Sequence, residues 1–260
     1  MKHVLWLIPI LCLLGWGQMR GPDGFREECL LRGVSWPNPP QHLSQEEIAD
    51  LLNQRFALLG HGTQSIALLG EDGVTVLKFL QNRSLKGRKR WEIPSVRDLL
   101  MGSRSERREE KRRREGREVL RRYALVYQKF HSETGLLCTQ LEGNAASEIR
   151  VVCGDGQERR ISLKGVPFWL QRRMEPAGRR LTQGKGGAEL RAFCEQWIRK
   201  GFCDVHSRGI AHVENFGFIG DRVFLMDAGR IEWSEEQEAH PEESVRALDF
   251  LITEWLRGRR

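Results

Sequence analysis

The sequence lacks several patterns that mark common classes of protein. No two cysteines have the CxxC spacing, so a zinc ribbon or a thiol redox motif is not expected. No segment recurs at the periods of roughly 20 to 50 residues that mark solenoid proteins. The longest apolar run, Val4–Trp16, has about 13 residues, whereas a helix needs about 20 to span a bilayer. A chain of 260 residues without these features is long enough for one sizeable domain or two small lobes.

The N-terminal segment is typical of an export signal. Lys2 and His3 give it a basic start, the apolar run follows, and Gly15 and Gly17 are small residues of the kind that signal peptidase favours. We therefore expect residues 1–17 to be a cleaved signal peptide and the protein to be exported or secreted. The alternative is an uncleaved membrane tether, which would make a membrane a partner through this segment.

Cysteine content and charge add little about the partner. Five cysteines follow the apolar run, and scattered buried thiols are the simpler expectation for this odd number, with one disulfide as the alternative in an oxidising compartment. The formal net charge of +7 favours acidic partners such as phosphates, nucleic acid or anionic lipid.

The first half of the chain predicts an arm, a short helix and three strands. Residues 18–42 are rich in glycine and proline and are interpreted as a linker or an extended arm. Ser44 and Glu47 form a capping box, which predicts a helix over Gln45–Asn53. Three short apolar runs between residues 55 and 81, joined through Gly/Asp turns, predict three antiparallel strands.

A long charged helix is predicted next. Residues 104–122 carry ten basic and five acidic side chains, and apolar residues then recur at helical spacing, which indicates one helix over about 105–131. Further strands are predicted over 136–141, 148–153, 159–163 and 168–172, helices over 188–199 and 242–257, and a hairpin from Phe216 to Met226. The predicted fold class is α+β.

Two features of the predicted strands suggest a site for phosphate. Gly60, Gly62 and Ser65 belong to a glycine-rich turn, whose backbone amides can approach phosphate closely. Lys78 lies inside an apolar strand, where a lone buried ammonium group is very costly and needs an anionic partner. The simpler alternatives are an ordinary hairpin turn and a lysine that faces outward.

The third feature is a run of polar residues in the second half of the chain. His206 to His212 reads HSRGIAH, Asn215 follows, and Asp227-Ala228-Gly229 comes after the predicted hairpin. A hairpin between Asn215 and Asp227 brings their side chains to one edge, and such oxygen ligands suit Mg²⁺. Asp227-Ala228-Gly229 taken alone would be an ordinary turn.

Together these motifs, in this order, resemble the protein-kinase-like superfamily over about residues 55–232. Within it, the chain looks most like uncharacterised kinase-like proteins of Chlamydia-related bacteria, which share a glycine loop, an NFGF-like segment and a D-x-GR segment. The resemblance implies a two-lobe fold: a small antiparallel sheet with its helix over residues 43–175, and a truncated helical lobe over residues 176–260.

The resemblance also implies the roles of individual residues and the cofactors, ATP and Mg²⁺. Lys78 would bind the phosphates beneath the turn that contains Gly60, Gly62 and Ser65. Asn215 and Asp227 would hold Mg²⁺, and Phe168–Glu175 resembles the strand whose backbone meets adenine. A glutamate of the long helix would pair with Lys78. Glu115 and Glu118 are the two candidates, because they lie nearest its apolar half; spacing does not choose between them, and Glu118 is counted among the cofactor-binding residues.

The catalytic loop departs from the kinase pattern. A kinase has an aspartate two residues after the loop histidine, whereas His212-Val213-Glu214-Asn215 is shorter and lacks it. Glu214 or Asp204 would then be the base, with His212 in the loop. Few residues follow Asp227, so recognition of a protein substrate is not expected.

Three functions therefore remain open. The chain is an atypical kinase that transfers phosphate to an unknown acceptor in a host cell or the envelope, or an inactive nucleotide-binding scaffold. The third is an exported basic protein whose charged helix binds nucleic acid or anionic membrane. Interspersed acids make a solvated helix the better interpretation of that charge, so nucleic acid is not the expected partner.

Overall fold

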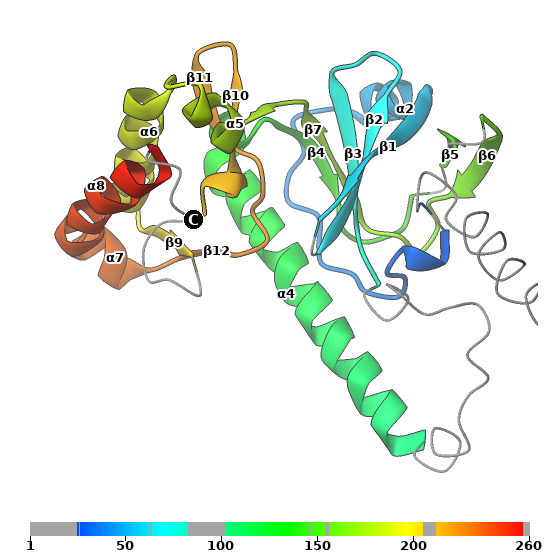
Figure 1. Cartoon of the computed structure of the whole chain (residues 1–260). Helices are drawn as coiled ribbons and strands as arrows, with labels where there is room; N and C mark the ends of the chain where they lie inside the picture. Colours follow the sequence, from blue (N-terminus) through cyan, green and yellow to red (C-terminus); the bar gives the residue numbers. More distant parts are fainter. Residues whose placement is uncertain are drawn as a thin grey trace, which may run out of the picture.

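The computed structural model describes residues 25, 27–62, 64–82, 102–145, 147–153, 156–204 and 212–256. It is a mixed α+β structure with a sheet-rich lobe, a group of helices, and the long helix α4 between them (Figure 1). The segment predicted to be an export signal, residues 1–17, lies outside the described residues.

Seven strands form the main sheet, in the order β4-β7-β3-β2-β1-β5-β6. All neighbours are antiparallel except β1 and β5. The predicted strands of the first lobe are confirmed, including the hairpin that joins β2 to β3. The strands are β1 (Arg55–His61), β2 (Ser65–Gly70), β3 (Thr75–Leu80), β4 (Leu136–Gln140), β5 (Glu148–Val152), β6 (Glu158–Ser162) and β7 (Phe168–Arg172).

The two faces of the sheet are covered by different parts of the chain. Helix α2 (Gln45–Leu52) buries Ile48 and Leu52 against one face, and the predicted capping box of Ser44 and Glu47 begins it. The described part of the predicted arm, residues 18–42, contains the 3-10 helix η1 (Glu27–Cys29) and then follows the sheet, where the N–H of Leu31 donates a hydrogen bond to the backbone oxygen of Leu80.

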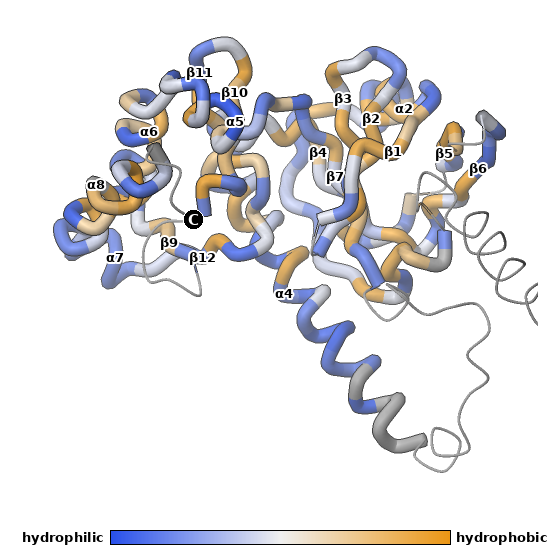
Figure 2. Tube along the Cα trace, viewed as in Figure 1, coloured by the Kyte–Doolittle hydropathy of each residue, from blue (hydrophilic) through white to orange (hydrophobic). Residues whose placement is uncertain are grey.

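Helix α4 (Gly102–Thr134) lies between the sheet and the helices. Its second half buries Leu120, Tyr123, Val126 and Tyr127 in the core that contains Trp169 of β7. Its first half extends beyond the sheet as a hydrophilic rod (Figure 2). The predicted division into an exposed front and a buried rear is therefore confirmed.

The C-terminal part is built from short elements around this core. The predicted hairpin and the predicted helices α6 and α8 are confirmed, whereas β8, β9, β12, α5 and α7 were not expected. The elements are β8 (Glu175–Pro176), α5 (Ala177–Thr182), α6 (Gly187–Arg199), β9 (Phe202–Asp204), the 3-10 helix η3 (Val213–Asn215), β10 (Phe216–Ile219), β11 (Arg222–Leu225), β12 (Ile231–Trp233), α7 (Glu235–Ala239) and α8 (Glu242–Leu256).

No disulfide joins the cysteines in the described part of the chain. Cys29, Cys138 and Cys194 are buried, and Cys153 and Cys203 are half-buried. Burial raises the pKa of Cys138 to about 12, so this thiol stays protonated and unreactive at neutral pH. The interpretation as scattered thiols fits the structure.

Candidate functional site

Lys78 points its ammonium group into the molecule, toward the segment that contains Asp227. Its Nζ donates a hydrogen bond to the backbone oxygen of Met226 over 2.8 Å, although the two residues are 148 positions apart. Burial lowers the pKa of Lys78, and the negative charge of Asp227 acts in the opposite direction. The structure therefore brings Lys78 to the residue beside Asp227.

Asn215 reaches the same place through the β10–β11 hairpin. Phe216 pairs with Leu225, so the residues just outside the hairpin, Asn215 and Met226, are also neighbours. The backbone oxygen of Asn215 accepts hydrogen bonds from the N–H groups of Met226 at 2.6 Å and Asp227 at 3.1 Å. Lys78 and the pair Asn215 and Asp227, which were predicted from two separate motifs, thus meet around Met226.

The Asp227 carboxylate is oriented by two donors. Its Oδ1 accepts from the N–H of Gly229 at 2.9 Å and from the hydroxyl of Tyr123 at 3.1 Å. Tyr123 is 2% exposed and stacks on Trp169 with 4.0 Å between ring centroids. Burial raises the pKa of Tyr123 well above its usual value, with a further contribution from Asp227, so the hydroxyl stays a donor.

Tyr123 is a site residue that the sequence analysis missed. It appeared there only as one member of the apolar stripe of the long helix. A buried tyrosine carries a polar hydroxyl that needs a partner, and this property was the available signal.

The glycine-rich turn rests on the segment after Asp227. The N–H of Gly62 donates to the oxygen of Ser65 at 2.8 Å, and the N–H of Gln81 donates to the oxygen of Gln64 at 2.9 Å. A Cβ atom at position 229 would lie 2.5 Å from Oε1 of Gln64, so glycine leaves room for this side chain there. The turn and the Asp227 segment are therefore in contact.

The expected ion pair between Lys78 and a glutamate of α4 is not found among the described residues. Oε2 of Glu118 accepts from Nε of Arg121 at 3.0 Å, and Glu115 lies 3.9 Å from Lys111. Neither glutamate pairs with Lys78 among the described residues. The reason is the rotation of α4, which directs Tyr123 instead of a glutamate toward Asp227.

Arginines of α4 connect the helix to the segment after Asp227. Arg122 donates to the oxygen of Gly229 at 3.0 Å and to Glu232 at 2.8 Å, and Arg121 donates to Glu232 at 3.1 Å. These bonds hold the residues that follow Asp227 against the helix.

The three residues predicted for catalysis lie in different surroundings. Glu214 is exposed in η3, directly before Asn215, and the backbone oxygen of the exposed His212 accepts from the N–H of Asn215 at 2.8 Å. Asp204 is 2% exposed at the end of β9, opposite Ile231 of β12. The predicted loop between Asp204 and His212, residues 205–211, lies outside the described residues.

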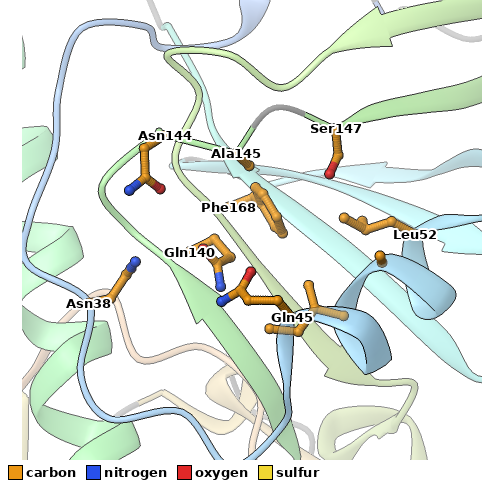
Figure 3. Close-up of a pocket in the computed structure, with 10 residues that line it drawn as sticks. Asn38, Gln45, Leu52, Gln140, Asn144, Ala145, Ser147 and Phe168 are labelled. Atoms are coloured by element: carbon orange, nitrogen blue, oxygen red, sulfur yellow. The ribbon is translucent and has the colours of Figure 1, made fainter.

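A separate pocket opens between α2 and the sheet, with a volume of about 280 Å³. Figure 3 shows the carboxamides of Gln45 and Gln140 pointing toward one another at its side, with Phe168 on its floor. Phe168, the first residue of the segment expected to contact adenine, lines this pocket, whereas the residues predicted to bind phosphate or metal do not.

Comparison with known proteins gives no further guide to the site. No protein-family model matches the chain, and no similar sequence is found among curated proteins. In the described part of the chain, no three His, Cys, Asp or Glu side chains gather at one point. Within the same residues, none of the helices has the length and apolar character needed to cross a membrane.

Proposed function

We propose that the chain binds ATP with Mg²⁺ in a protein-kinase-like cleft between its sheet and its C-terminal helices. The observation that carries this proposal is the meeting of Lys78, Asn215 and Asp227 around Met226. Asn215 and Asp227 flank one hairpin and are neighbours for that reason alone. The independent support is the approach of Lys78 to Met226 from a strand 148 positions away.

The groups at this point suit a metal-bound triphosphate. One oxygen of Asp227 is occupied by Tyr123 and Gly229, which leaves the other oxygen to bind a metal, and Mg²⁺ prefers such oxygen ligands. The side chain of Asn215 would supply a second ligand. The buried ammonium group of Lys78 has one backbone acceptor and would gain phosphate oxygens.

Other predicted residues would complete the cleft. Gly60, Gly62 and Ser65 would cover the phosphates, and the backbone of β7 and the residues after it, Phe168–Glu175, would meet adenine. The Gln64 side chain lies against Gly229, so a nucleotide bound between the turn and Asp227 would displace it.

Transfer of phosphate to an acceptor is the second part of the proposal. Glu214 suits the role of base better than Asp204, because it is exposed beside Asn215 whereas Asp204 is 2% exposed. The alternative is a module that binds nucleotide without transfer. It is favoured by the pairing of Glu118 with Arg121, which leaves Lys78 without the acid that orients it in kinases.

Thermal unfolding with Mg-ATP tests the proposal. A ligand at about 100 times its Kd stabilises the fold by about 2.7 kcal/mol, which raises Tm by about 5 to 10 °C in a chain of this size. We expect Asp227→Ala and Lys78→Met to lose this shift. Asp221→Ala is the matched control, because Asp221 is an exposed acid in the β10–β11 turn.

The outcomes separate the alternatives. An equal Mg-ATP shift in Asp227→Ala and Asp221→Ala would refute the site. Labelled ATP then distinguishes transfer from binding: label that appears on an acceptor or on the chain, and that disappears in Glu214→Gln, supports the kinase. Binding without any turnover supports the inactive module.

A further inference from the structure

A second pocket lies between the first half of α4, the end of β3 and the residues after Asp227. Its volume is about 410 Å³. Leu31, Leu80 and Val119 give it an apolar floor, and the side chains of four arginines line it: Arg112, Arg114, Arg122 and Arg230. Positive charge beside an apolar floor attracts an anion more strongly than it would in open water.

Three of these arginines have no acidic partner among the residues that the structure describes. Arg122 is engaged by Glu232 and by the oxygen of Gly229. Within the described ranges, no carboxylate forms an ion pair with Arg112, Arg114 or Arg230. The two acids that line the pocket contact other basic residues.

Those two acids, Glu115 and Glu118, contact basic residues of their own helix. Glu118 accepts from Arg121 at 3.0 Å, and Glu115 lies 3.9 Å from Lys111. The pocket therefore keeps more positive than negative charge, and its acids are not free to neutralise the three arginines.

Other arginines of the same helix are paired. Arg113 lies 2.7 Å from Glu109 and Arg117 lies 3.0 Å from Glu110, and neither arginine lines the pocket. The pocket is thus lined by four arginines and two glutamates, so positive charge is in excess there. Gathered like charges repel one another, and an anion bound among them would remove this cost.

Gln81 adds a second polar feature to the pocket. It lines the pocket and is 7% exposed, and its side-chain Oε1 is buried without a hydrogen-bond donor among the described residues. Its backbone N–H donates to Gln64, which fixes its position. A ligand with a hydroxyl group beside its phosphate would supply the missing donor after a small shift of this side chain.

We propose that this pocket is a binding site for a small phosphate-bearing ligand, held by Arg112, Arg114 and Arg230. Guanidinium groups bind phosphate through paired N–H donors, which suits three arginines that form no ion pair within the described ranges. The pocket borders the proposed nucleotide cleft, because Gln64 of the glycine-rich turn lines it, but Lys78, Asn215 and Asp227 do not line it. It does not require the proposed function to be correct.

Calorimetric titration of the full chain with inorganic pyrophosphate, without Mg²⁺, tests this proposal. We expect one pyrophosphate to bind per chain, and binding to weaken as salt is raised. Arg112→Gln and Arg230→Gln should each weaken binding about tenfold, which corresponds to about 1.4 kcal/mol. Arg113→Gln is the matched control, because the same change one position away removes an arginine outside the pocket, and it should bind like the natural chain.

Lys78→Met separates the two sites and should leave pyrophosphate binding unchanged. Binding of the chain to vesicles that contain phosphatidylinositol bisphosphate, compared with binding to phosphatidylcholine vesicles, shows the source of the phosphate. Vesicle binding that depends on Arg112 assigns the phosphate to a lipid headgroup. Absence of vesicle binding assigns the phosphate to a soluble ligand. The proposal is overturned if the natural chain does not bind pyrophosphate. It is also overturned if Arg112→Gln and Arg230→Gln bind normally while Lys78→Met does not.

Discussion

The hydrogen bond from Tyr123 to Asp227 allows a quantitative test of how α4 positions the candidate site. Tyr123→Phe keeps the ring, its burial and its stacking on Trp169, and removes only the hydroxyl. A hydrogen bond to a charged group contributes about 1.5 to 3 kcal/mol. Gly229 still donates to the same oxygen of Asp227, so we expect a cost near the lower value, about 1.5 kcal/mol.

A double-mutant cycle isolates this bond from other effects of the substitution. The free energy of unfolding is measured by urea denaturation for the natural chain, Tyr123→Phe, Asp227→Ala and the double variant. We expect a coupling energy of about 1 to 2 kcal/mol, because the two side chains are in direct contact. The pKa of Tyr123 is raised, so the coupling should be the same at pH 6 and pH 8.

Tyr127 provides the control cycle. It is a buried tyrosine one turn further along α4, and its hydroxyl donates to the oxygen of Leu137 at 3.2 Å. Tyr127→Phe combined with Asp227→Ala should show no coupling beyond about 0.5 kcal/mol. Equal coupling in the two cycles, or none in the Tyr123 cycle, would show that α4 does not hold the Asp227 carboxylate.

Three further outcomes are expected. The pKa of Lys78 is lowered below 10.5, so the folded chain releases this proton before the unfolded chain does. Urea denaturation should therefore show the natural chain gaining stability relative to Lys78→Met as pH rises toward 10.5, and a constant difference would contradict the burial. Gly201→Ala should destabilise the fold by about 1 to 3 kcal/mol, because φ is +82° and a Cβ would lie 2.8 Å from the oxygen of Ser234; an unchanged Tm would contradict this. Ser44→Ala should lower the free energy of unfolding by about 1 kcal/mol through loss of the capping box, as measured against Ser132→Ala on an exposed helical position.

Much of the fold could be predicted because its elements have clear local patterns. The β2–β3 hairpin follows from two apolar runs around a Gly/Asp turn, and α2 follows from its capping box. The elements that were missed are short. β8, β9 and β12 have two or three residues, so no periodicity can develop in them, and contacts with distant parts of the chain decide their conformation.

Three members of the candidate site were predictable, but Tyr123 and the contacts within the site were not. The order of the motifs identified Lys78, Asn215 and Asp227 as candidates, and in the structure these residues lie around Met226. The acid expected beside Lys78 was not predictable, because the rotation of α4 about its axis is set by packing. Tyr123 and Leu120 are directed into the core, which leaves Glu118 beside Arg121 on the surface.

The contact between Gln64 and Gly229 has a kinetic consequence. If the turn must lift before a nucleotide can enter, the observed association rate would stop rising at high nucleotide concentration and level off at the rate of opening. Shortening Gln64 to alanine would remove the contact and raise this plateau without changing any group that holds the phosphates. The side chain of one residue in the glycine-rich turn would then set how fast the cleft can be filled.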